Sequence, residues 1–251
     1  MKKNTLVDKV LPPLVCISML MALAAALLYA PTEKVMGDTQ RIFYFHVPAA
    51  ISAFICFFLV FIGSVQYLRT RYAHWDRLAL CAAEIGVLFG LIVLVTGPLW
   101  AKPIWGVYWR WEPRLTSMLI AFSIYVAYLM LRTQGASGGQ TPRIAAVLGI
   151  VAFINVPLVH YSVDLWAADQ QLHPQRNVDL QPEMLYALYV CFAAFFLLLA
   201  LLLRRRIELA KIEEIQEIEE GKKYKEQPKE PEPQEEEPKE EPEEEPKKEE
   251  P

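Results

Sequence analysis

Residues with reactive side chains are scarce in this sequence. It contains four histidines and four cysteines in 251 residues, and no two cysteines have the Cys-x-x-Cys spacing. All four cysteines lie in apolar runs, where a thiol usually packs as a small hydrophobic side chain. These observations exclude a thiol oxidoreductase and covalent cofactor attachment through a Cys-x-x-Cys-His motif.

Motifs for nucleotide hydrolysis and for acid–base or nucleophilic catalysis are also missing. The chain has no Gly-x-x-x-x-Gly-Lys-Ser/Thr sequence, no conspicuous pair of carboxylates and no Ser/His/Asp set. Its apolar runs contain almost no ionisable residue except Glu84, which is either a relay or paired within the bundle. We therefore expect a protein that is not an enzyme and does not hydrolyse ATP itself.

Charged residues are concentrated in a few blocks. Hydrophobic residues make up 54% of the chain and charged residues 22%, which favours a membrane protein when the charge is clustered. The segment 212–251 contains 18 glutamates and 7 lysines, and it accounts for the negative net charge of −4. We expect a membrane domain over 1–211 and a mostly disordered Pro/Glu/Lys-rich tail over 212–251, with no helix continuing past Gly221.

Long apolar runs predict the fold. A helix that crosses the bilayer needs about 20 mostly apolar residues, because no water in the bilayer satisfies open backbone groups. Six runs meet this requirement: Leu11–Ala30, Ala49–Leu68, Leu78–Val95, Leu115–Leu131, Ile144–Tyr161 and Met184–Leu203. The expected fold is all-α, a polytopic membrane protein with six transmembrane helices.

Lysine and arginine are divided unequally between the two sides of these helices. The side that holds the N-terminus carries 12 of them, and the opposite side carries 6. Because short cytoplasmic loops hold the positive excess, we expect both termini to be cytoplasmic. The segments 31–48, 96–114 and 162–183 then face outward, and the unusual residues of the chain collect in them.

The middle outward segment is rich in tryptophan. It holds four of the six tryptophans, Trp100, Trp105, Trp109 and Trp111. Glycine and proline are expected to break any long helix here, and the indoles would then form a broad apolar shelf that suits stacking on a flat ring such as a porphyrin. An interfacial aromatic belt explains isolated tryptophans but explains this cluster poorly.

Charged residues accompany the tryptophans. Arg110, Arg114 and Lys102 could pair with the propionates of haem, because guanidinium binds carboxylate in a two-pronged geometry. Arg114 could instead only anchor the interface. Glu112 could orient an indole N–H or Arg114, or serve as an ordinary helix cap.

Three of the four histidines lie on the outer side. Neutral imidazole is a good axial ligand of haem iron, so His46 and His173, in separate outward segments, could clamp a ring between them. We expect these two as iron ligands of a transient, non-covalent haem b. His160 is the reserve candidate, and His74, on the cytoplasmic side, is assigned no function.

The segment Trp105-Gly-Val-Tyr-Trp-Arg-Trp-Glu-Pro-Arg114 resembles the tryptophan-rich signature of haem-handling membrane proteins of cytochrome c biogenesis. Within that superfamily, which includes CcmF and CcsA, residues 10–205 look most like the CcmC family. The resemblance extends to Phe-His-Val-Pro around His46, to Arg-Leu-Thr-Ser from Arg114, and to a histidine loop before the sixth span. It implies that His46 and His173 are the external ligands and that Trp105, Gly106, Trp109, Trp111 and Glu112 meet the haem.

The resemblance also implies a cellular setting. The protein would lie in the bacterial inner membrane as a multi-pass protein in contact with lipid, with its haem site on the periplasmic side. It would present haem to a periplasmic haem chaperone and associate with a very small single-span subunit and ABC transporter subunits. No nucleic acid is expected as a partner.

Two departures from the family pattern and three alternatives accompany this expectation. Glu112 stands where the family normally has Asp, and Tyr108 where another Trp is often found. A subunit of a haem-ligating cytochrome c synthetase would have more spans and histidines inside its helices, and a di-haem cytochrome b would need paired histidines in facing helices. A haem transporter permease would be expected to carry more polar residues in its helices.

Overall fold

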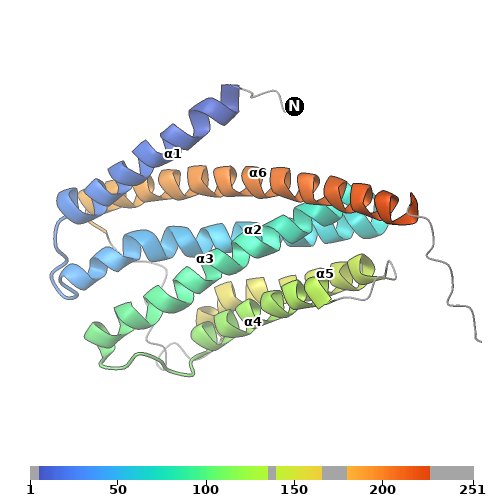
Figure 1. Cartoon of the computed structure of the whole chain (residues 1–251). Helices are drawn as coiled ribbons and strands as arrows, with labels where there is room; N and C mark the ends of the chain where they lie inside the picture. The colour runs from blue at the N-terminus through green and yellow to red at the C-terminus, as the bar shows by residue number, and fades with distance from the viewer. Residues whose placement is uncertain (1–5, 135–139, 166–179, 227–251) are drawn as a thin grey trace, which may run out of the picture. The chain divides into compact units, whose positions relative to one another are not determined.

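The structure is a computed structural model that describes residues 6–134, 140–165 and 180–226. Apart from one isolated bridge between Glu33 and Gly37, regular structure in these residues is helical (Figure 1), as the expected all-α fold requires. The helices are α1 (Leu6–Ala24), the π-helix η1 (Ala25–Tyr29), the 3-10 helix η2 (Asp38–Ile42), α2 (Phe43–Thr70), α3 (Ala73–Trp105), α4 (Pro113–Gln134), α5 (Thr141–Leu165) and α6 (Pro182–Glu226).

Six helical stretches of the described chain are long and apolar enough to cross a membrane, which confirms the six expected spans. They are Leu6–Tyr29, Asp38–Thr70, Ala73–Trp105, Pro113–Gln134, Thr141–Val159 and Pro182–Gln216. The longest contain 33 to 35 residues. Because a helix rises about 1.5 Å per residue, these exceed the roughly 30 Å thickness of the apolar layer.

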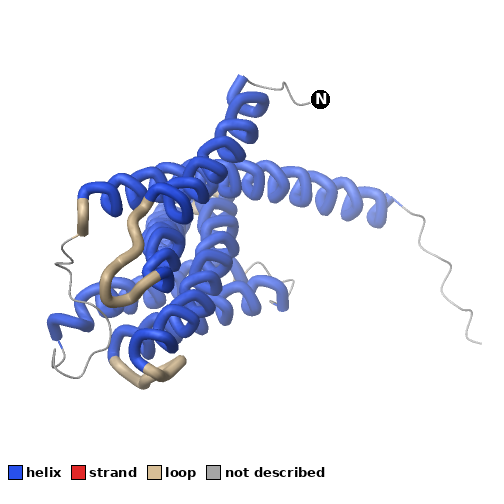
Figure 2. The backbone as a smooth tube through the Cα atoms, turned by 90° about the vertical axis from the view of Figure 1, so that its left-hand side faces the viewer, coloured by secondary structure: helices blue, strands red, loops and turns tan. Residues whose placement is uncertain are grey.

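The third helix is longer than its apolar run predicts. The expectation that Gly97, Pro98 and Pro103 would break the helix is wrong, because α3 continues through all three. Each proline removes one backbone hydrogen bond, but Trp100 and Ala101, which lie between the two prolines, are buried in the bundle. Their packing offsets the lost bonds, and the connection to α4 shortens to 106–112, which is one of the tan segments in Figure 2.

The second helix also begins earlier than expected. It starts at Phe43, so His46 lies in its first turns rather than in a loop before it. Residues three and seven positions further on share a helix face with His46, and these are Ala49 and Ala53, both fully buried. The helical phase therefore turns His46 into the bundle, where its side chain is 8% exposed.

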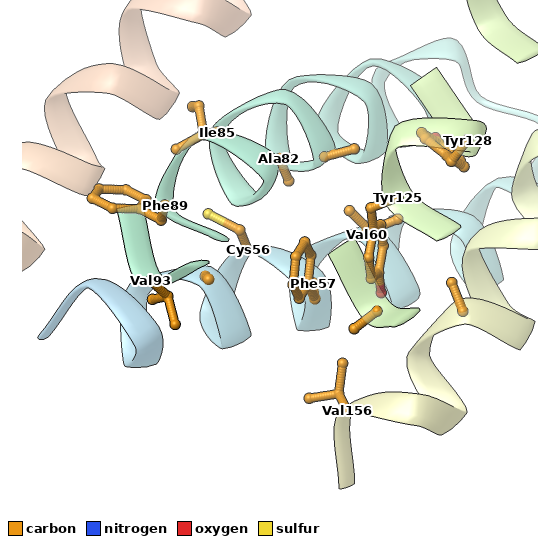
Figure 3. Close-up of a cluster of buried hydrophobic side chains, with 14 of the residues drawn as sticks. Cys56, Phe57, Val60, Ala82, Ile85, Phe89, Val93, Tyr125, Tyr128 and Val156 are labelled. Atoms are coloured by element: carbon orange, nitrogen blue, oxygen red, sulfur yellow. The ribbon is translucent and has the colours of Figure 1, made fainter. Parts of the chain in front are cut away.

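Small residues allow α2 and α3, the most extensively packed pair of helices, to approach closely. A Cβ added at Gly86 of α3 would lie 2.7 Å from the ring of Phe57 and 2.9 Å from Cys56, both on α2. Phe57 is stacked in turn on Tyr125 of α4, with ring centroids 3.8 Å apart (Figure 3). The core thus forms where α2, α3 and α4 meet.

Ion pairs connect α3 to two other helices. Arg132 of α4 donates two hydrogen bonds to Asp76, at 2.5 and 2.7 Å. Arg206 of α6 pairs with Glu84. The ionisable residue of the third apolar run is therefore paired within the bundle, the second of the two roles considered for it.

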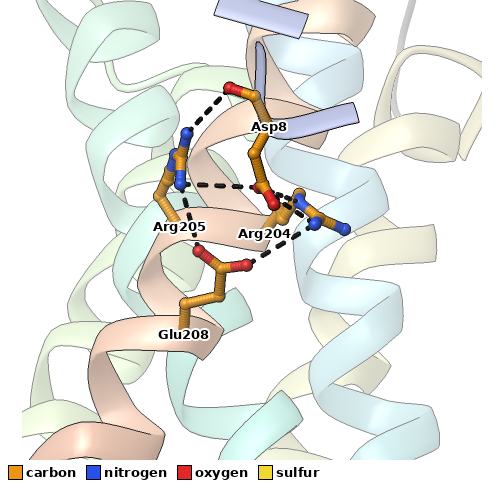
Figure 4. Close-up of polar contacts among 4 residues, drawn as sticks. All are labelled: Asp8, Arg204, Arg205 and Glu208. Carbon is orange, nitrogen blue, oxygen red and sulfur yellow. Dashed lines mark hydrogen bonds and ion pairs between the residues drawn. The ribbon is translucent and has the colours of Figure 1, made fainter. Parts of the chain in front are cut away.

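A further charged cluster joins α1 to α6. Asp8 accepts hydrogen bonds from the side chain of Arg204, and Arg205 donates to its backbone carbonyl (Figure 4). Glu208 pairs with both arginines. These contacts fix the start of α1 against α6 and neutralise part of the arginine block.

The chain divides into two compact units, residues 1–211 and 212–251. Helix α6 begins in the first and continues through Gly221 to Glu226, so the expectation that it could not pass Gly221 is wrong. A glycine inside a helix costs only about 1 kcal/mol, and the glutamates and lysines around this one are good helix formers. The candidate site lies in the first unit.

Candidate functional site

One end of the first unit contains a cavity of about 260 Å³. Its walls come from the first turns of α2, the last turns of α3, the connection 106–112 and the start of α4, with Val159 of α5. The lining is mostly apolar. Segments far apart in the sequence therefore meet here, and the predicted site residues can be placed relative to this cavity.

His46 reaches the cavity from α2. Its Nδ1 lies 2.8 Å from Oγ1 of Thr96 on α3, and its ring packs against the edge of Trp100 with centroids 5.8 Å apart. The tertiary packing of α2 against α3 therefore determines the orientation of the imidazole.

Three of the four clustered tryptophans line the cavity, namely Trp100, Trp105 and Trp109. Trp111 does not, because its side chain is 76% exposed, although it contacts Trp109 edge to face. The indole N–H groups of Trp100 and Trp109 are buried and have no hydrogen-bond partner among the described residues. They are donors available to a polar group of a bound molecule.

Gly106 lies outside the cavity lining and has a structural role. Its φ of 75° is left-handed, and its N–H donates to the carbonyl of Lys102 at 3.0 Å, which ends α3. Lys102 in return donates from Nζ to the carbonyl of Gly106 at 2.8 Å and lies over the ring of Tyr108. Lys102 thus stabilises the turn and does not line the cavity.

The other charged residues of the segment do line it. Arg110 is exposed, and Arg114 lies in the first turn of α4. Glu112 is 4% exposed, and its backbone carbonyl accepts the first hydrogen bond of α4 from Thr116. Glu112 therefore occupies the helix-cap position through its backbone and also lines the cavity, as do Arg110 and Arg114, whose guanidinium groups can bind carboxylates.

Comparison with known proteins now identifies the family. The model of the CcmC family, heme exporter protein C, matches residues 2–220. This chain belongs to the heme exporter protein C family. The heme exporter protein C of Paracoccus denitrificans is 36% identical over 187 residues, covering 71% of this chain and 77% of that protein. That of Escherichia coli K12 is 34% identical over 184 residues, covering 71% and 73%.

A mitochondrial relative also matches. A putative cytochrome c biosynthesis ccmC-like protein of Marchantia polymorpha is 35% identical over 180 residues, covering 71% of this chain and 76% of that protein. Heme exporter protein C is a non-enzymatic, multi-pass membrane component of cytochrome c biogenesis. The family resemblance and the expectation of a non-enzymatic protein are therefore confirmed.

Two of the other three histidines belong to described helices. His173 lies outside the described residues. The backbone of His160 belongs to α5, directly after the cavity residue Val159, but its side chain is not described. His74 lies in the first turn of α3, beside Tyr72 and Trp75.

Sequence reasoning missed several residues of the site. Thr96 and Gly97 contact His46, and Met118 of α4 and Phe54 of α2 complete the wall. Thr96 could have been found from its spacing, because it precedes Trp100 by four residues and a helix places both on one face. That signal was hidden by the assumption that the helix ended before Gly97.

Proposed function

We propose that this protein binds haem b in the cavity, non-covalently and transiently, with Nε2 of His46 as an axial ligand. The observation that supports this proposal is the position of His46 in the wall of an apolar cavity, together with Trp105 and Trp109. Neutral imidazole suits haem iron, and indole surfaces suit the porphyrin face.

The polar groups around the cavity match the rest of a haem molecule. Arg110 and Arg114 can bind the propionates, and the buried indole N–H groups of Trp100 and Trp109 can donate to polar atoms at the ring edge. Trp111 and Glu112 belong to the same segment, which Gly106 turns toward α4. The propionates would then lie at the exposed rim and the iron beside His46.

The cavity is small for haem, which suits transfer of the haem to a partner protein. Its volume of about 260 Å³ is just below the roughly 300–1,000 Å³ of pockets that enclose a drug-sized ligand. A porphyrin bound with one face against His46 would be only partly enclosed. The uncovered part would be open to a periplasmic haem chaperone that takes the ring.

The second iron ligand is assigned to His173. It lies in the segment that connects α5 to α6, which in this topology faces the same side as the connection 106–112. His160 is the alternative, because its neighbour Val159 lines the cavity. Two histidines on opposite faces of the ring would give a six-coordinate, low-spin iron.

The cellular setting follows from the charge distribution and the family. The positive excess near the N-terminus and at Arg204, Arg205, Arg206 and Lys211 of α6 favours cytoplasmic termini, which would put the cavity on the periplasmic side of a bacterial inner membrane. Partners would be a periplasmic haem chaperone, a small single-span subunit, ABC transporter subunits and the surrounding lipid. Nucleic acid has no role in this proposal.

The test is the visible spectrum of the purified full-length protein after titration with haemin. We expect a low-spin, six-coordinate spectrum in the wild type, and at least roughly ten-fold weaker haemin binding in His46→Ala and His173→Ala, since even loss of residues that only support a ligand costs 10–100-fold. His74→Ala is the control, because it removes an imidazole outside the cavity.

Each outcome has a clear meaning. Unchanged spectra and affinities in both His46→Ala and His173→Ala would refute the proposed clamp. If haemin binding is weakened in His46→Ala and His160→Ala but is normal in His173→Ala, the second iron ligand is His160 of α5.

A further inference from the structure

One turn of α3 holds the imidazole of His46. Oγ1 of Thr96 lies 2.8 Å from Nδ1, and Trp100 packs edge to face against the ring. Gly97 lies beside the ring as well, because a Cβ at this position would be 3.5 Å from Cε1 of His46. The three residues leave the ring little freedom to rotate.

The hydrogen bonds of Thr96 determine which ring nitrogen carries the proton. Its Oγ1 lies 2.7 Å from the carbonyl oxygen of Ile92, and two oxygens approach this closely when a hydrogen bond joins them. The carbonyl has no proton to donate, so the single hydroxyl proton of Thr96 points to Ile92. Toward His46, Thr96 can then only accept, and Nδ1 of His46 must be the N–H donor.

We propose that Thr96 is a positioning residue for haem: it holds His46 as the Nδ1–H tautomer and thereby directs the lone pair of Nε2 to the iron. The inference rests on the proposed function, because it requires His46 to bind iron. A hydrogen bond from the remote nitrogen of a metal-bound histidine fixes the ring and increases its basicity as a ligand. Thr96 acts through His46 and does not touch the haem iron.

Thr133 shows what a purely structural role of the Thr96 hydroxyl would look like. Threonine hydroxyls in helices often bond to a carbonyl of the preceding turn. Thr133 of α4 does so with Met130 at 3.0 Å, at the opposite end of α4 from the cavity residue Arg114. If only this local bond mattered, Thr96 and Thr133 would respond alike to loss of the hydroxyl.

The experiment uses purified full-length protein titrated with haemin. Thr96→Val keeps the shape of the side chain and removes the acceptor, Thr96→Ser keeps the acceptor, and Thr133→Val is the matched control. We expect Thr96→Val to bind haemin roughly ten-fold more weakly, the lower end of the range for such supporting residues. Its midpoint potential should rise, because a less basic imidazole stabilises ferric iron less.

The controls separate this inference from the proposed function. Thr96→Ser and Thr133→Val should match the wild type in affinity and potential, and Thr96→Ala serves as a second variant if Thr96→Val does not fold. Wild-type affinity and potential in Thr96→Val, or an equal loss in Thr96→Ser, would overturn the positioning role. Normal binding by His46→Ala would instead refute iron ligation by His46, and the role of Thr96 with it.

Discussion

At the scale of single residues, Gly106 determines where the aromatic segment turns. Its left-handed backbone ends α3 between Trp105 and Trp109, which both line the cavity. A Cβ at Gly106 would meet no atom within 4 Å, so only the backbone conformation requires glycine. Substitution would therefore act on the direction of the chain and not on packing.

Gly106→Ala should weaken haemin binding severalfold while leaving the melting temperature of the bundle nearly unchanged. A side chain with this left-handed backbone costs about 1–2 kcal/mol, and the turn can relieve the strain by moving the tryptophans. Gly37→Ala is the control, because Gly37 has a φ of 59°, equally open surroundings and no place in the cavity wall. Haemin titration and thermal unfolding of both variants are the measurements, and equal weakening in both would contradict the prediction. Gly106→Asn should restore part of the affinity.

At the scale of elements, α3 contributes both to the cavity wall and to the ion pairs between helices. Its last turns carry Thr96 and the cavity tryptophans Trp100 and Trp105. Its first turns carry Asp76 and Glu84, which pair with α4 and α6. The helix that holds the imidazole is thus fixed to its neighbours through charges at its other end.

Asp76→Asn should lower the free energy of unfolding by about 3 kcal/mol, because it leaves the charge of Arg132 without its partner in a mostly buried position. The side chains of Asp76 and Arg132 are only 17% and 12% exposed. Asp38→Asn is the matched control, since Asp38 is 77% exposed in its pair with Arg41 and screening by water makes that pair weak. Denaturant unfolding in detergent would measure the difference, and similar stabilities of the two variants would argue against this account.

The elements also show what the sequence could predict. Apolar run length predicted six spans, because the bilayer imposes a minimum apolar length on every crossing helix. Helix ends were predicted poorly, since packing of Trp100 outweighs the local effect of Pro98. The contact between His46 and Thr96 joins residues 50 positions apart, so it arises from the packing of α2 on α3, which no local pattern specifies.

At the scale of the whole first unit, the bundle has two different ends. The ion pairs between helices, made by Asp8, Asp76 and Glu84, lie in the first turns of α1 and in the N-terminal half of α3. The cavity lies where α3 ends and α2 and α4 begin. The ion pairs lie at the same end as the excess of lysine and arginine near the N-terminus and at 204–211 of α6.

Trypsin should therefore cleave the lysine-containing segment 212–251 only from the cytoplasmic side. In sealed right-side-out vesicles that contain the full-length protein, a C-terminal epitope should survive external protease, and it should be lost after permeabilisation. The physical reason is the retention of positive charge in the cytoplasm during insertion. Loss of the epitope in sealed vesicles would show the opposite topology, with the cavity on the cytoplasmic side.

Glycine contacts between α2 and α3 determine the geometry around His46. A Cβ at Gly63 would lie 2.8 Å from the carbonyl of Trp75, and Gly86 meets Phe57 just as closely, so these positions set the spacing of α2 and α3. A slip of one residue along either helix is a shift of about 1.5 Å, more than half of the 2.8 Å that separates His46 from Thr96. Glycines that do not line the cavity thus determine how closely Thr96 approaches His46.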